Sequence, residues 1–135
     1  MRNTKAQTPF YLISTLVLHE SDQNNVERAD RVAAQLTAAD VPFKRLALKI
    51  KGYKEGDAPV FLLDAQDINY VHRIARENFQ SHFVSVNAFS VGTRIDIANN
   101  RQDSVIGNLK TLPKSLLAAS QVYLETTDGT VYVWS

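Results

Sequence analysis

The chain has 135 residues, of which 44% are hydrophobic and 21% charged, which predicts one globular domain over residues 1–135 and excludes a disordered chain. Lys and Arg number 15 against 14 Asp and Glu, and the formal charge of +1 argues against a nucleic-acid partner bound by electrostatic attraction. The absence of cysteine excludes disulfides and thiolate metal ligands.

The N-terminal segment combines a polar end with an apolar strand. Residues 1–8 are polar, and we expect them to be disordered. Residues 10–18 are rich in aromatic and β-branched side chains, which favours a central strand, and the run is too short to span a bilayer. His19 and Glu20 follow where a signal peptide has small residues, so we expect a cytoplasmic protein without a membrane segment.

Helical periodicity predicts two helices. The first begins near Asn24, which has Glu27 at the spacing of a capping box, and it ends near Asp40, just ahead of a proline. The second is capped by Asp64 or Asp67 and carries its apolar side chains on one face.

The order of strands and helices predicts the fold. The expected strands cover residues 10–18, 43–51, 59–63, 82–89, 93–98, 122–126 and 131–134. Residues 99–103 are expected to form a loop, and residues 104–119, which Pro113 interrupts, remain unassigned. The order strand, helix, strand, strand, helix, strand is typical of an α+β, ferredoxin-like open sheet, here with an added C-terminal β-hairpin. An open sheet leaves one face bare, so we expect an oligomer.

A compact loop between two of these strands concentrates reactive side chains. Its sequence is Gly52-Tyr53-Lys54-Glu55-Gly56-Asp57, so an aromatic hydroxyl and two carboxylates lie within five positions. Loops carried by a rigid sheet are frequent places for ligand chemistry. The alternative interpretation is an ordinary hairpin turn whose charges face water.

Other local motifs for chemistry are missing from the sequence. His19, His72 and His82 do not have the spacing of metal ligands, so no metal site is expected. The sequence also lacks a Gly-x-Ser-x-Gly motif and a glycine pattern that cradles phosphate. Ser14, inside the first strand, is expected to be a packing residue, and Gln80 either ends the second helix or points into a site.

Several segments match the pattern of a known family in their order and spacing. They are Phe10-Tyr11-Leu12-Ile13-Ser14, residues 28–39, Gly52-Tyr53-Lys54-Glu55, Val71-His72-Arg73-Ile74-Ala75, Phe79-Gln80, Phe83-Val84-Ser85-Val86 and residues 123–134. In these segments the chain resembles the small bacteriophage S-adenosylmethionine lyases, also called SAM hydrolases. The resemblance covers most of the chain at low identity.

The resemblance implies a PII-like trimer of ferredoxin-like subunits, with the ligand bound between subunits. It also implies an intramolecular reaction in which the substrate's carboxylate attacks its own γ-carbon. The products are 5′-methylthioadenosine and homoserine lactone, or homoserine if the lactone opens. Such an enzyme lowers the S-adenosylmethionine of the host and counters restriction. S-adenosylmethionine is then the substrate, and no cofactor is implied.

The resemblance assigns site residues position by position. Tyr53 matches the loop tyrosine of the family. The family's loop glutamate stands at a longer spacing and lacks a direct counterpart, so Asp57 is the first candidate and Glu55 the second. Gln80 matches a glutamine at the end of the second helix, and Ser14 lies in the matched first strand as a substrate contact.

The expected function is therefore a cytoplasmic S-adenosylmethionine lyase that acts as a homotrimer with sites at subunit interfaces. Two other classes stay open. One is a non-catalytic trimeric regulator that binds S-adenosylmethionine or an adenine nucleotide. The other is a protein inhibitor of a host defence enzyme, which needs no pocket.

Overall fold

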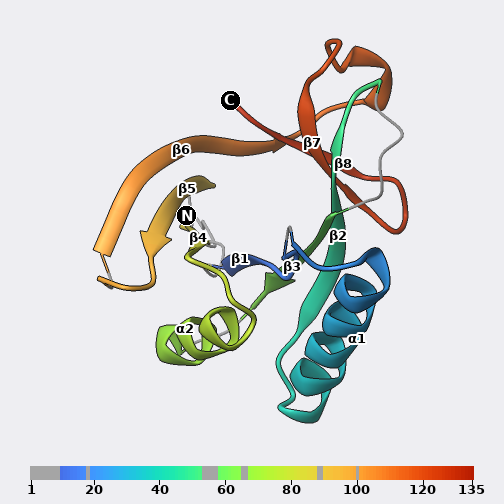
Figure 1. Cartoon of the computed structure of the whole chain (residues 1–135). Coiled ribbons are helices and arrows are strands. Elements are labelled where there is room, and N and C mark those ends of the chain that lie inside the picture. Colours follow the sequence, from blue (N-terminus) through green and yellow to red (C-terminus); the bar gives the residue numbers. More distant parts are fainter. Residues whose placement is uncertain (1–9, 18, 53–57, 65–66, 88–89, 100) are drawn as a thin grey trace.

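The computed structural model describes residues 10–17, 19–52, 58–64, 67–87, 90–99 and 101–135. Within these ranges the chain forms two α-helices, eight strands and one turn of 3-10 helix (Figure 1). In chain order the elements are β1 (Phe10–Ser14), α1 (Asp22–Ala38), β2 (Phe43–Ile50), β3 (Ala58–Leu63), α2 (Ile68–Glu77), β4 (His82–Val86), β5 (Val91–Asp96), β6 (Arg101–Thr111), the 3-10 turn η1 (Lys114–Leu116), β7 (Val122–Thr126) and β8 (Val131–Trp134).

Both α-helices begin at a side chain that caps the free amide groups of the first turn. Ser21 precedes α1, and its hydroxyl accepts a hydrogen bond from the backbone N–H of Asn24 at 3.1 Å. The helix thus starts earlier than the capping box predicted at Asn24. Asp67 caps α2 by accepting from the backbone N–H of Asn69 at 2.9 Å. No helix in the described ranges is long and apolar enough to cross a membrane.

Two hydrophobic cores bury opposite faces of β1, β3 and β4, and β2 contributes its buried Leu46 to one of them. Side chains alternate between the faces of a strand, so neighbours such as Leu12 and Ile13 serve different cores. The helix-side core consists of Ile13, Ala29, Val32, Leu36, Phe61, Leu63, Val71, Ile74, Ala75, Phe83 and Ile95. The barrel core, inside the ring of strands, consists of Leu12, Leu46, Val60, Val86, Leu109 and Leu124.

The strands close into a single antiparallel ring. The hydrogen-bonded order is β1-β3-β2-β7-β8-β6-β5-β4, and β4 pairs back with β1. Figure 1 shows the long strand β6 curving away from β5 to reach β8. On the two sides of β6, Trp134 of β8 lies so close to Gly92 of β5 that a Cβ atom added to Gly92 would be 2.4 Å from a carbon of the indole ring. A glycine at this position therefore lets the indole ring approach the backbone.

The predicted open ferredoxin-like sheet is wrong, and the PII-like architecture is wrong with it. The order β4-β1-β3-β2 does occur, but in an open sheet β2 and β4 would be free edges. Here β7 pairs with β2, and β5 pairs with β4. The closing element is β6, which includes residues predicted as a loop and residues left unassigned. Most of its side chains are exposed, so it carries no alternating apolar pattern that would have marked it as a strand.

Candidate functional site

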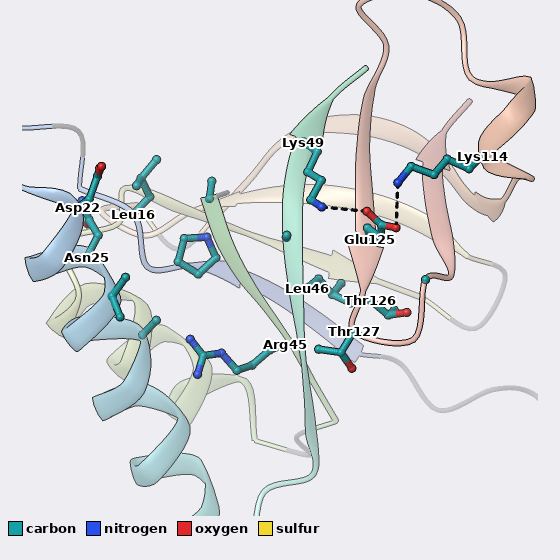
Figure 2. Close-up of a pocket in the computed structure, with 16 residues that line it drawn as sticks. Leu16, Asp22, Asn25, Arg45, Leu46, Lys49, Lys114, Glu125, Thr126 and Thr127 are labelled. Atoms are coloured by element: carbon teal, nitrogen blue, oxygen red, sulfur yellow. Dashed lines mark hydrogen bonds and ion pairs between the residues drawn. The ribbon is translucent and has the colours of Figure 1, made fainter. Parts of the chain in front are cut away.

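A groove lies on the helix side of the sheet, next to the first two turns of α1. Its volume is about 850 Å³, within the range of roughly 300–1,000 Å³ that is common for small-molecule sites. Figure 2 shows α1 forming one wall, β2 and β3 the floor, and β7 with the turn after it the other wall. The lining residues are Leu16, Asp22, Asn25, Val26, Ala29, Arg45, Leu46, Ala47, Lys49, Ala58, Pro59, Lys114, Glu125, Thr126, Thr127 and Gly129.

A cluster of three charged side chains, Lys49, Glu125 and Lys114, lies on one side of the groove. The two carboxylate oxygens of Glu125 each accept a hydrogen bond from a different ammonium group. Lys49 Nζ donates to Oε1 at 3.0 Å, and Lys114 Nζ donates to Oε2 at 3.3 Å (Figure 2). Lys49 comes from β2, Glu125 from β7 and Lys114 from η1, so the cluster depends on the pairing of β2 with β7.

The two ammonium groups keep Glu125 ionised. The hydrogen bond from Lys49 is the largest cause that lowers the pKa of Glu125 below its ordinary value. Burial acts in the opposite direction, because a carboxylate loses hydration in a partly closed site. The hydrogen bond from Lys114 and the charges of both lysines lower the pKa further. The groove therefore offers a fixed negative charge beside two positive charges at neutral pH.

Arg45 and Asp22 carry the charge on the α1 side of the groove. Arg45 Nη1 donates to Asp30 Oδ1 of α1 at 3.0 Å, and its guanidinium lies 5.4 Å from the centre of the Phe61 ring. Figure 2 shows the Arg45 side chain extending toward α1, away from Glu125. The two charged regions are thus separate. One end of the groove holds the charged cluster around Glu125, and the other end, at α1, combines charged, polar and apolar side chains.

Two residues of the predicted site, Ser14 and Gln80, come together at the edge of this groove. Both bind the backbone of Leu16, which lines it. The Ser14 hydroxyl accepts a hydrogen bond from the Leu16 N–H at 3.2 Å. Gln80 Nε2 donates to the Leu16 carbonyl at 3.0 Å and to the Asn78 carbonyl at 3.1 Å. Ser14 and Gln80 therefore fix the groove wall, and a direct contact of either with a ligand stays a prediction.

Helix α1 holds the same wall through the backbone of Val17, the residue after Leu16. Asn25 is buried, and its Oδ1 accepts from the Val17 N–H at 2.8 Å while its Nδ2 donates to the Val17 carbonyl at 3.1 Å. The buried guanidinium of Arg28 donates to Asn25 Oδ1 at 3.1 Å and pairs with Glu20. These contacts tie the segment after β1 to α1, so the wall at Leu16 is preorganised.

The predicted loop residues Tyr53, Glu55 and Asp57 lie outside the described residues. The strands on either side of them are described, and both reach the groove. Lys49 of β2 lines it before the loop, and Ala58 of β3 lines it directly after the loop. The assignment of Tyr53, Glu55 and Asp57 as catalytic residues stays a prediction.

Sequence reasoning missed Glu125 and Lys114. Glu125 lies 76 residues from Lys49, in a strand that was predicted as part of a hairpin without a known partner. Lys114 lies in a segment that was left unassigned. The available signal was Glu125, an acidic residue in the mainly apolar strand β7. It indicates a site only when the strand that pairs with β7 is known.

Two histidines, His72 and His82, contact neighbouring side chains in the fold. His72 is buried in α2, and its ring meets the Phe83 ring edge-on at 5.0 Å between centroids. His82 Nε2 lies 3.1 Å from Asp103 Oδ2, which also pairs with Arg94. Over the same residues, no group of three or more His, Asp or Glu side chains is placed to hold a metal ion.

The chain was compared with protein-family models and with curated proteins. Neither comparison finds a match. The resemblance to S-adenosylmethionine lyases therefore rests on the sequence segments alone.

Proposed function

We propose that the protein is an S-adenosylmethionine lyase whose substrate lies in the groove between α1, β2 and β7. The observation that carries this proposal is the position of the groove. Both strands that hold the Tyr53 loop line it, and Ser14 and Gln80 fix its edge. Two residues that the family resemblance selects, Ser14 and Gln80, thus contact the backbone of a residue that lines a groove of suitable volume.

The reaction needs little from the protein beyond shape and charge. One oxygen of the substrate's α-carboxylate forms a bond to the γ-carbon, and the bond from that carbon to sulfur breaks. The electron pair of the broken bond returns to the sulfonium, which leaves as the neutral thioether 5′-methylthioadenosine. Homoserine lactone remains, and no proton moves. The protein accelerates this step by folding the substrate into a near-attack conformation and excluding water.

Each predicted loop residue has a role in this proposal. The ring of Tyr53 attracts the positive sulfonium through its π-face. A loop carboxylate, Asp57 or Glu55, orients the positively charged substrate. Ser14 and Gln80 hold the wall against which the substrate folds.

The biological setting belongs to the same proposal. The protein acts in the cytoplasm of a phage-infected host, lowers its S-adenosylmethionine and so counters restriction. We further propose a homotrimer, in which the groove of each subunit is lined by residues of a single chain. Apolar side chains that stay exposed on β2 and β7, Leu48, Ile50 and Val122, are suited to a subunit contact. A measurement of mass by light scattering tests this, and a monomer would contradict it.

The enzymatic test uses purified protein and S-adenosylmethionine without a methyl acceptor. We expect 5′-methylthioadenosine to appear in chromatography well above the spontaneous rate, and mass spectrometry of the second product to distinguish lactone from homoserine. Tyr53→Ala should abolish turnover, whereas Tyr53→Phe should retain it, because the ring face rather than the hydroxyl attracts the sulfonium. Lys110→Met, an exposed substitution on β6, serves as the control.

The outcomes separate the proposal from its alternatives. Full activity of Tyr53→Ala would show that the loop assignment is wrong. Binding of S-adenosylmethionine without release of 5′-methylthioadenosine would indicate the non-catalytic regulator. Neither binding nor turnover would leave the inhibitor of a host defence enzyme as the better hypothesis.

A further inference from the structure

We propose that Lys114 and Glu125 form a subsite for the zwitterionic α-amino-acid end of the ligand, with Glu125 binding its ammonium and Lys114 its carboxylate. The identity of the ligand as S-adenosylmethionine rests on the function proposed above. The subsite itself rests on the geometry of the charged cluster at one end of the groove (Figure 2).

The cluster has one firm contact and one loose contact. Lys49 Nζ lies 3.0 Å from Glu125 Oε1, and the two side chains are 30% and 13% exposed. Lys114 Nζ lies 3.3 Å from Glu125 Oε2, and the Lys114 side chain is 54% exposed. Lys49 therefore anchors the carboxylate, whereas the pair between Lys114 and Oε2 is the one that an incoming ligand can open most easily.

Both groups of the loose pair have unused hydrogen-bonding capacity. An ammonium carries three donors, and the contact described for Lys114 uses one of them, toward Glu125. An ionised carboxylate has about four acceptor positions, and the two lysines occupy two of them. A ligand can thus bind to both groups without displacing the anchor at Lys49.

Charge complementarity selects the kind of ligand. The cluster places ammonium groups and a carboxylate side by side, so a ligand that carries both signs of charge fits it better than one that brings only positive charge. A zwitterion brings a carboxylate for Lys114 and an ammonium for Glu125, and it adds no net charge. An α-amino acid presents these two groups on one carbon, a spacing that matches two adjacent side chains in contact.

The rest of the groove provides space for the remainder of such a ligand. In Figure 2 the cluster lies toward β7, whereas Leu16 and Asn25 lie toward α1. The predicted residues Ser14 and Gln80 fix the Leu16 end. The nucleoside part of the ligand would therefore extend from the charged cluster toward α1.

The test measures binding of two related ligands by calorimetry. S-adenosylhomocysteine carries the amino-acid end, and 5′-methylthioadenosine lacks it. We expect Lys114→Met and Glu125→Gln each to weaken binding of S-adenosylhomocysteine by about tenfold or more, because one charged partner is lost. Binding of 5′-methylthioadenosine should change by less than about twofold, since it does not reach the cluster.

Matched controls remove one charge of each sign away from the groove. Lys110→Met on β6 and Glu27→Gln on α1 change exposed residues, and both should bind the two ligands like the wild type. Lys114→Met removes an exposed side chain, so it remains folded even if Glu125→Gln does not. A circular-dichroism spectrum confirms the fold of each variant.

Each possible result either supports or overturns the proposed subsite at Lys114 and Glu125. Loss of S-adenosylhomocysteine binding alone supports the subsite, even if the wild type shows no turnover and the lyase proposal fails. Unchanged binding of both ligands, or equal loss of both by Lys114→Met, overturns the subsite. If the wild type cleaves S-adenosylmethionine and both variants keep its KM, the lyase proposal stands and the subsite is wrong. A wild type that binds neither ligand overturns the subsite as well.

Discussion

The two halves of the barrel differ in how they are buried. In the N-terminal half, β1, β3 and β4 lie between the helix-side core and the barrel core, and Phe61 of β3 is completely buried. In the other half, Val105 of β6 is 68% exposed, and only a small cluster around Tyr123 and Val133 covers the outer face of β7 and β8. We therefore expect the N-terminal half to supply most of the stability. The groove lies where the halves join, at the pairing of β2 with β7.

The largest effect should come from the doubly buried half. Phe61→Ala removes a fully buried ring from the helix-side core and should lower the free energy of unfolding by about 3–5 kcal/mol. Val105→Ala, the control in the exposed half, should change it by less than about 0.5 kcal/mol. Urea unfolding followed by circular dichroism measures both. Similar losses at the two positions would contradict the proposed division of stability.

A second substitution tests the contact between Gly92 of β5 and Trp134 of β8, on the two sides of β6. Gly92→Val places a side chain where a Cβ atom already lies 2.4 Å from the Trp134 ring, so it should cost about 1–3 kcal/mol by overpacking. Trp134 is the sole tryptophan of the chain, so its emission spectrum should shift in the same variant.

A substitution at Trp134 distinguishes overpacking against the indole ring from a loss of stability that Gly92→Val causes within β5 itself. In a double-mutant cycle, Trp134→Leu should relieve part of the cost of Gly92→Val, because the smaller side chain leaves space for the added methyl groups. Additive losses would mean that the two residues do not meet over β6.

The same contrast explains how much of the fold the sequence predicts. In the N-terminal half, apolar periodicity correctly locates both helices and strands β1 to β4, because each element there buries a regular face. In β6 the exposed residues 101–106 bury no such face, so residues 101–103 were predicted as part of a loop and residues 104–106 were left unassigned. Closure of the ring depends on pairing between distant segments, which no local pattern encodes.

The candidate site shows the same limit. Ser14 and Gln80 were selected from the sequence, and the structure brings both to Leu16, although as ligands of the backbone. Glu125 and Lys114 were missed because their relation to Lys49 exists only after β7 pairs with β2. Composition marks reactive residues within one loop, but it does not mark a cluster assembled from three elements.

The smallest expected effect concerns the ion pair between Lys49 and Glu125, which links β2 to β7, and it appears in the pH dependence of stability. The pKa of Glu125 is lowered in the folded protein, chiefly by the hydrogen bond from Lys49. The stabilisation is therefore present above the unfolded pKa of Glu125, and it is lost as the pH falls through the folded pKa. Glu125→Gln should lower the free energy of unfolding at pH 7 by no more than about 1 kcal/mol, as expected for a partly exposed pair.

Urea unfolding at pH 7 and at acidic pH measures this contribution. The loss of stability on acidification should be smaller in Glu125→Gln than in the wild type, because the variant lacks one carboxylate that must be protonated. It should not vanish, since hydrogen bonds from Thr126 and Thr130 also lower the pKa of Asp128. Lys49→Met should flatten the acid response much as Glu125→Gln does, because it removes the main cause of the shift. An unchanged slope in both variants would mean that the ion pair between Lys49 and Glu125 does not contribute to joining the two halves.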